Sequence, residues 1–125
     1  MKLKKITPSF MREDQRGLFV EAINGTLWKN ISYGKMKKGG VMGNHYHKKT
    51  KVFFFVAKGA ANIDVIDVDS KDRGSILVSE NEGIILAPNH SHAINFLADS
   101  IFIMGKSLKY IASSPDTYEY KVSES

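Results

Sequence analysis

Apolar residues in this chain alternate with polar ones or gather in short runs that are rich in Val, Ile and Phe. Turn-forming pairs such as Asn24-Gly25, Gly39-Gly40 and Pro88-Asn89 separate these runs. No stretch repeats apolar residues at helical spacing over several turns. The pattern therefore predicts strands near residues 17–23, 30–37, 52–58, 61–68, 74–79, 83–87, 91–97 and 100–108.

This many short strands in 125 residues predict one all-β domain, residues 1–125, built as a sandwich or a barrel. We expect the barrel core at about 17–108 and a C-terminal tail at about 109–125. Weak alternation in the tail favours a final edge strand or a strap to a second copy. Because sheet edges and the apolar run Phe53-Phe54-Phe55 favour self-association, we also expect a homodimer.

The composition of the chain indicates which kinds of ligand and partner to expect. The net charge is +5 and the pI about 9.4, but only 3 of the 18 basic residues are Arg, which argues against nucleic acid and favours a small anionic ligand. The absence of cysteine excludes a disulfide scaffold, a thiolate zinc site and a cysteine nucleophile. No apolar segment has the length of a membrane helix or the form of a signal peptide, so we expect a cytoplasmic protein without a membrane partner.

The four histidines fall in two pairs, His45-Tyr46-His47 and His90-Ser91-His92. Side chains two positions apart on a strand point to the same face, so each pair projects to one side. If both strands line one barrel, three or four imidazoles meet inside it. Neutral imidazole is both a common metal ligand and a proton-transfer group near pH 7, so the pattern predicts a functional site. His90, beside a turn, is the weakest member.

The first histidine pair also carries a family resemblance. Gly39, His45, His47 and Gly59 occupy the spacing of the first cupin motif, with Val52 where cupins commonly carry a metal-binding Glu. His92 is the matching histidine of the second motif. The chain thus resembles the cupin superfamily, which implies a double-stranded β-helix, that is, a small antiparallel jelly-roll barrel.

Three enzyme groups within that superfamily share further motifs with the chain. Residues 14–24 resemble the D-x-R-G-x-F-x-E-x-x-N opening of dTDP-4-dehydrorhamnose 3,5-epimerases. Residues 45–51 are similar to the H-A-H-K-K-x-K signature of dTDP-4-keto-6-deoxyhexose 3,4-ketoisomerases, and Gly43-Asn44-His45-x-His47 to capsular sugar-nucleotide epimerases. The resemblance implies an isomerase or epimerase that acts on a 4-keto-6-deoxyhexose nucleotide.

The same resemblance implies a role for each matching residue. His45 would remove a proton next to the sugar ketone, and His47 would assist. Arg16 would bind the nucleotide diphosphate, in its own barrel or the partner's, and Glu21 would lie near the base. The remaining substrate-binding candidates are Asn44, Tyr46 and Lys49. From the chemistry of the reaction alone, Tyr33, Tyr46 and Tyr110 are candidate acids for returning the proton.

Two other hypotheses stay open beside this enzyme, which requires no cofactor. His45, His47 and His92 form a three-histidine set that would hold a divalent transition metal such as Zn, Fe, Ni or Mn and support other chemistry. Alternatively, the chain is a sugar-nucleotide-binding module without catalysis.

Overall fold

The structure is a computed structural model that describes residues 1–25 and 27–122. The last three residues of the expected tail therefore lie outside the described residues. Within the described ranges all regular structure is β-strand, and the ladders are antiparallel. The described residues contain no helix long and apolar enough to cross a membrane.

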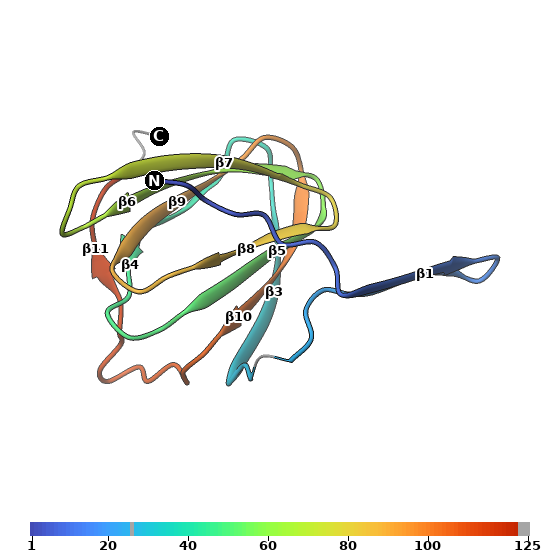
Figure 1. Cartoon of the computed structure of the whole chain (residues 1–125), viewed down its shortest axis with the longest axis horizontal. Helices are drawn as coiled ribbons and strands as arrows, with labels where there is room; N and C mark the ends of the chain where they lie inside the picture. Colours follow the sequence, from blue (N-terminus) through green and yellow to red (C-terminus); the bar gives the residue numbers. More distant parts are fainter. Residues whose placement is uncertain (26, 123–125) are drawn as a thin grey trace.

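Two sheets pack against each other to form the predicted jelly-roll barrel (Figure 1). One has the order β3-β10-β5-β8 and comprises β3 (Asn30–Met36), β10 (Ser100–Lys106), β5 (Val52–Lys58) and β8 (Glu82–Leu86). The other has the order β11-β4-β9-β6-β7 and comprises β11 (Tyr118–Glu119), β4 (Val41–Tyr46), β9 (His90–Phe96), β6 (Ala60–Asp67) and β7 (Arg73–Ser79). Each strand predicted from the apolar pattern has a counterpart.

The core fills the space between the two sheets. Phe54, Phe96 and Phe102 contact one another with ring centroids 5.4–6.1 Å apart, and aliphatic residues of β5, β6, β8 and β9 surround them. Phe53 and Phe55 lie on the other face of β5, yet each is only 2% exposed because the chain itself covers them. The Trp28 ring, for example, stacks on Phe53. The Phe53-Phe54-Phe55 run therefore supplies core but no exposed dimer face.

Two strands were not predicted from the apolar pattern. β1 (Phe10–Asp14) pairs with β2 (Gly17–Glu21) in a separate hairpin that extends away from the barrel (Figure 1). β4 was missed because Gly43, Asn44 and His45 interrupt its apolar alternation. The alternation fails there because the strand contains a β-bulge, where the register with β9 shifts between Gly43 and His45.

The tail lies on the barrel as the final edge strand that was one of its two predicted forms. Tyr118 and Glu119 of β11 pair with Tyr46 and His45 of β4. This pairing brings the end of the chain beside the strand that carries the first histidine pair.

Candidate functional site

Three histidines meet inside the barrel. His45 on β4 lies directly opposite His92 on β9, and His47 follows the end of β4. The ring centroids are 5.0–5.7 Å apart, and one nitrogen from each ring lies within 4.8 Å of the other two. His47 and His92 are only 6% and 3% exposed. The two sequence-distant histidine motifs thus form one enclosed cluster.

The bulge in β4 sets the register of this cluster. Gly43 has φ +98°, and a Cβ atom there would lie 2.5 Å from the His92 carbonyl oxygen. Asn44 follows with φ +57°, a left-handed conformation that asparagine tolerates better than most residues. The local sequence Gly43-Asn44 therefore permits the close approach of β4 to β9 that places His45 against His92.

Backbone carbonyls fix the protonation of two rings. His47 Nδ1 lies 2.6 Å from the Asp116 carbonyl oxygen, and His92 Nδ1 lies 3.2 Å from the His90 carbonyl oxygen. A carbonyl oxygen only accepts hydrogen bonds, so in both rings Nδ1 carries the proton and donates. The Nε2 atoms of His47 and His92 are left with lone pairs, available as base or ligand.

Burial and mutual repulsion keep the cluster uncharged. Burial lowers the pKa of His45 to about 4, with further contributions from His47 and Lys106. Burial also lowers the pKa of His92 to about 3, helped by the charge of His45, and lowers the pKa of His47. At neutral pH the site therefore presents three neutral imidazoles.

Lys106 is a site residue that the sequence analysis missed. On β10 it shares the inward face with Phe102 and Met104, and it pairs across the sheet with Val52. Its positive charge lowers the pKa of all three cluster histidines. The alternation Phe102-x-Met104-x-Lys106 could have indicated this position. It predicts that Lys106 lies on the same core-facing side of its strand as Phe102 and Met104. The cluster thus combines three neutral donors with one ammonium group.

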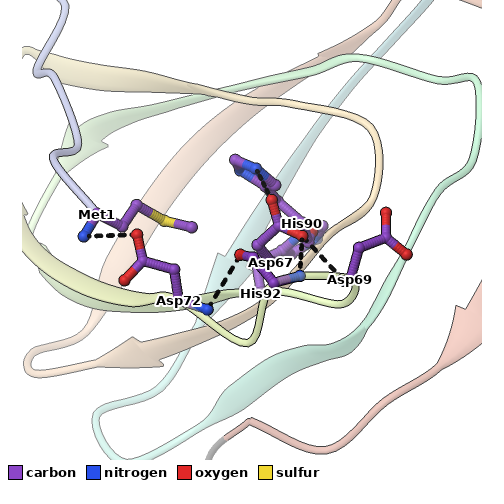
Figure 2. A network of polar contacts seen from close by, with 7 residues as sticks. Met1, Asp67, Asp69, Asp72, His90 and His92 are labelled. Atoms are coloured by element: carbon purple, nitrogen blue, oxygen red, sulfur yellow. Dashed lines mark hydrogen bonds and ion pairs between the residues drawn. The ribbon is translucent and has the colours of Figure 1, made fainter.

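His90 lies apart from the other three histidines. Its Nε2 is 3.4 Å from the Asp67 carboxylate on the neighbouring strand β6 (Figure 2). The side chain is about a quarter exposed. His90 contributes its carbonyl oxygen to the orientation of His92 and leaves its own ring outside the cluster.

Arg16 and Glu21 are not brought to the cluster of their own chain. Both belong to the β1-β2 hairpin, where Arg16 forms an ion pair with Asp14 at 2.8 Å and remains 72% exposed. The Glu21 carboxylate accepts a hydrogen bond from the Ser9 hydroxyl at 2.9 Å. Their predicted nucleotide contacts stay a prediction, and the hairpin that carries both residues extends away from the barrel (Figure 1).

Asn44 and Tyr46 both contact the tail. The Asn44 side chain accepts a hydrogen bond from the Val122 N–H at 2.7 Å. The Tyr46 ring lies 5.5 Å from the Tyr118 ring and 6.3 Å from the Tyr120 ring, so it packs on the tail instead of the histidines. These contacts give both residues a structural role in docking the end of the chain.

A small cleft lies beside one member of the cluster, His47. Its lining includes His47, Lys106 and Tyr110. Tyr110 is thus the one of the three candidate acids that the structure places beside the site. Tyr33 pairs with Ile103 on the outer face of β3 and is 76% exposed. Lys49 lines an adjoining hollow, while Val52 is buried in the core at 1% exposure.

Solved structures with the same architecture include capsular polysaccharide assembling protein CapF from Staphylococcus aureus. It is 28% identical over 90% of this chain and 32% of its own, with a TM-score of 0.71. This chain therefore spans about a third of that protein.

Two enzymes share the fold over most of their length. A 3,4-ketoisomerase from Helicobacter canadensis is 20% identical over 94% of this chain and 90% of its own, with a TM-score of 0.78. The dTDP-4-dehydrorhamnose 3,5-epimerase from Sulfolobus tokodaii is 21% identical over 82% and 69% of the two chains, with a TM-score of 0.71. At these identities the likeness establishes the fold, the jelly-roll barrel that the sequence predicted.

The sequence itself identifies a family. None of the curated proteins matches the chain. A family description, however, covers residues 12–118, which includes most of the hairpin, the barrel and the start of the last strand. The chain therefore belongs to the polysaccharide biosynthesis C-terminal domain family.

Proposed function

We propose that this chain is a sugar-nucleotide isomerase or epimerase that removes a proton next to a ketone at the histidine cluster. The observation that carries the proposal is the convergence of three imidazoles, whose nitrogens lie within 4.8 Å of one another, beside a cleft that His47 and Lys106 line together. An ammonium group there favours an anion that forms during the reaction. The similarity to CapF, a ketoisomerase and an epimerase supports a keto sugar as the substrate.

The chemistry is a proton transfer in two steps. An imidazole nitrogen of His45 takes the proton from the carbon next to the ketone, and the electron pair of the C–H bond moves onto the carbonyl oxygen. The Lys106 ammonium stabilises the resulting enolate. Return of a proton to the opposite face gives an epimer, whereas proton transfer between the neighbouring oxygens and carbons gives a ketoisomer. Tyr110 in the cleft is the proton donor in this scheme.

The three-histidine set also supports a second candidate, a metal-dependent form of the same reaction. His45, His47 and His92 converge, and carbonyl-bound Nδ1 atoms leave two Nε2 lone pairs free to coordinate. The donor set fits a divalent transition metal, which would polarise the ketone oxygen as a Lewis acid. The charge of Lys106 opposes a cation, so we place the metal-independent form first.

Turnover of dTDP- and UDP-4-keto sugars in D₂O tests the function, because proton removal exchanges the C–H for deuterium. We expect exchange with the wild type and a loss of about 100-fold or more in His45→Asn. His90→Asn is the matched control, since it removes an imidazole outside the cluster. Full exchange in His45→Asn, or binding of the sugar nucleotide without any exchange, would overturn the proposal. The latter result would identify a binding module.

Elemental analysis by mass spectrometry separates the two forms. The metal-independent form predicts exchange activity in protein that contains no stoichiometric transition metal. A stoichiometric metal that is retained in His90→Asn and lost in His92→Asn would establish the metal-dependent form. In that case Lys106→Met is expected to bind the metal more tightly, because a repelling charge has been removed.

A further inference from the structure

A second hollow, of about 410 Å³, lies beside the cleft and is outside the cluster described so far. Four lysines from three segments of the chain line it, Lys29, Lys48, Lys49 and Lys109. Within the described residues none of the four forms an ion pair with a carboxylate. Such a concentration of uncompensated positive charge in a concave site attracts an anion of more than one charge.

The one carboxylate in the wall is already engaged. The Asp116 carboxylate accepts hydrogen bonds from the backbone N–H groups of Lys48, Lys49 and Thr50, each at 2.9 Å, and from the Thr50 hydroxyl at 2.9 Å. These bonds delocalise the negative charge over the backbone of residues 48–50, here called the lysine loop, and hold that loop in place. Asp116 thus orders the wall of the hollow and leaves the lysine side chains as its exposed charges.

The hollow also has an apolar and aromatic side. Leu108, Ile111 and Pro115 line it together with the Tyr118 ring, over which the Lys48 ammonium lies at 4.2 Å from the centroid. A bare phosphate would leave this surface unused, whereas a ligand with a flat base or a sugar beside its phosphates covers it.

The position of the hollow relates it to the histidines. Thr50, Leu108, Lys109 and Asp116 line both this hollow and the cleft that contains His47. A ligand that spans the shared wall would place one end among the lysines and the other toward His47.

We propose that this lysine hollow binds the nucleoside diphosphate of the sugar nucleotide, with the sugar directed along the shared wall toward His47. The inference rests on the proposed function and deepens it. It assigns the diphosphate to lysines of the same chain, in place of Arg16 on the distant hairpin. It also explains why the tail, which closes one wall of the hollow, is bound so firmly to the barrel.

Isothermal titration calorimetry with dTDP, UDP, pyrophosphate and thymidine tests the assignment. We expect dTDP or UDP to bind more tightly than pyrophosphate, and thymidine to bind weakest. Lys49→Ala with Lys109→Ala is expected to weaken nucleotide binding by about 10-fold or more. This pair leaves the Lys48–Tyr118 contact intact, and an unchanged melting temperature verifies the fold. A Lys49→Arg, Lys109→Arg variant that keeps the charge is expected to retain most of the affinity.

The matched control is Lys35→Ala with Lys37→Ala, which removes the same charge from another hollow that includes Asp99. Equal weakening in both double variants would indicate a general charge effect and overturn the proposal. Binding that ignores Lys49 and Lys109 but is lost in Arg16→Ala would overturn it as well, as would pyrophosphate binding as tight as dTDP.

Failure of this assignment differs from failure of the proposed function. Nucleotide binding through the lysines without any C–H exchange on keto sugars supports the hollow and overturns the isomerase. Exchange that depends on His45, with binding indifferent to the lysines, retains the isomerase and overturns the hollow.

Discussion

The two ends of the chain differ in how closely they contact the barrel. The tail is bound to it: the Asp116 carboxylate accepts four hydrogen bonds, and the Ser91 hydroxyl donates to the Tyr120 carbonyl at 2.6 Å. The β1-β2 hairpin extends away from it (Figure 1) and leaves Phe10, Leu18 and Phe19 about half exposed.

This difference separates two kinds of site residue. The tail acts on the cluster of its own chain, because the Asp116 carbonyl orients His47. Arg16 on the hairpin has no such route to its own histidines. The motif residues of the hairpin and those of the cluster therefore lie in separate parts of the structure.

The bulge in β4, whose Asn44 side chain binds the tail, is the place where we expect a substitution to reduce stability most. Gly43→Ala adds a Cβ atom against the His92 carbonyl at a position with φ +98°. We expect a loss of about 3–5 kcal/mol in the free energy of unfolding, because the clash is with backbone and the register of His45 depends on it. Urea unfolding followed by tryptophan fluorescence measures the change.

Gly17→Ala in the hairpin is the counterpart. Gly17 also has a positive φ, +141°, but no atom lies within 4 Å of the added Cβ. We expect a cost of about 1 kcal/mol or less, confined to the hairpin. Similar losses in the two variants would show that the hairpin unfolds together with the barrel.

The contrast between the tail and the hairpin also extends to one carboxylate in each, Asp116 and Asp14. Hydrogen bonds from Lys48, Lys49 and Thr50 lower the pKa of Asp116 to about 2, although burial acts in the opposite direction. The Arg16 side chain lowers the pKa of Asp14, whose side chain is 29% exposed. We expect Asp116→Ala to reduce the free energy of unfolding by about 2–3 kcal/mol, since it releases the tail from the lysine loop.

Asp14→Ala is the control for that substitution, and we expect no change in its urea midpoint. Protease digestion supplies a second readout, because release of the tail exposes residues 107–122 to cleavage in Asp116→Ala alone. An Asp116→Ala variant with wild-type stability and an intact tail would show that the carboxylate does not fasten the end of the chain.

Local pattern was sufficient for much of the barrel and for the choice of histidines. Apolar alternation located the strands that pack the core, and the spacing of His45 and His47 indicated a shared face. β4 was not predicted, because Gly43 and Asn44 interrupt its alternation of apolar and polar residues. The interruption corresponds to the bulge, where the register of β4 with β9 shifts.

The remaining site residues depend on contacts between distant parts of the sequence. Lys106 enters the cluster through the inward register of β10, and Asp116 through hydrogen bonds to residues 66–68 positions earlier. A local pattern predicts which face a residue takes but not which strand lies opposite. For the same reason the sequence did not place Tyr46 on the tail.

Apolar side chains of the hairpin are about half exposed, and the Arg12 guanidinium lies over one of them, 5.3 Å from the Phe19 ring centroid. The Phe10 and Phe19 rings lie 6.3 Å apart, and Phe19 is 53% exposed. The homodimer expected from the sequence would cover them with a second copy. We predict that Phe19→Ser weakens self-association by about 10-fold and leaves the melting temperature of the barrel unchanged.

Sedimentation equilibrium of the wild type and Phe19→Ser measures this difference directly. Leu77→Ser is the matched control, because Leu77 on β7 has a comparable exposure of 48% but lies on the barrel. A monomeric wild type, or equal weakening in both variants, would contradict a dimer built on the hairpin. A dimer lost only in Phe19→Ser would place the hairpin, with Arg16 and Glu21, at the boundary between two copies of the chain.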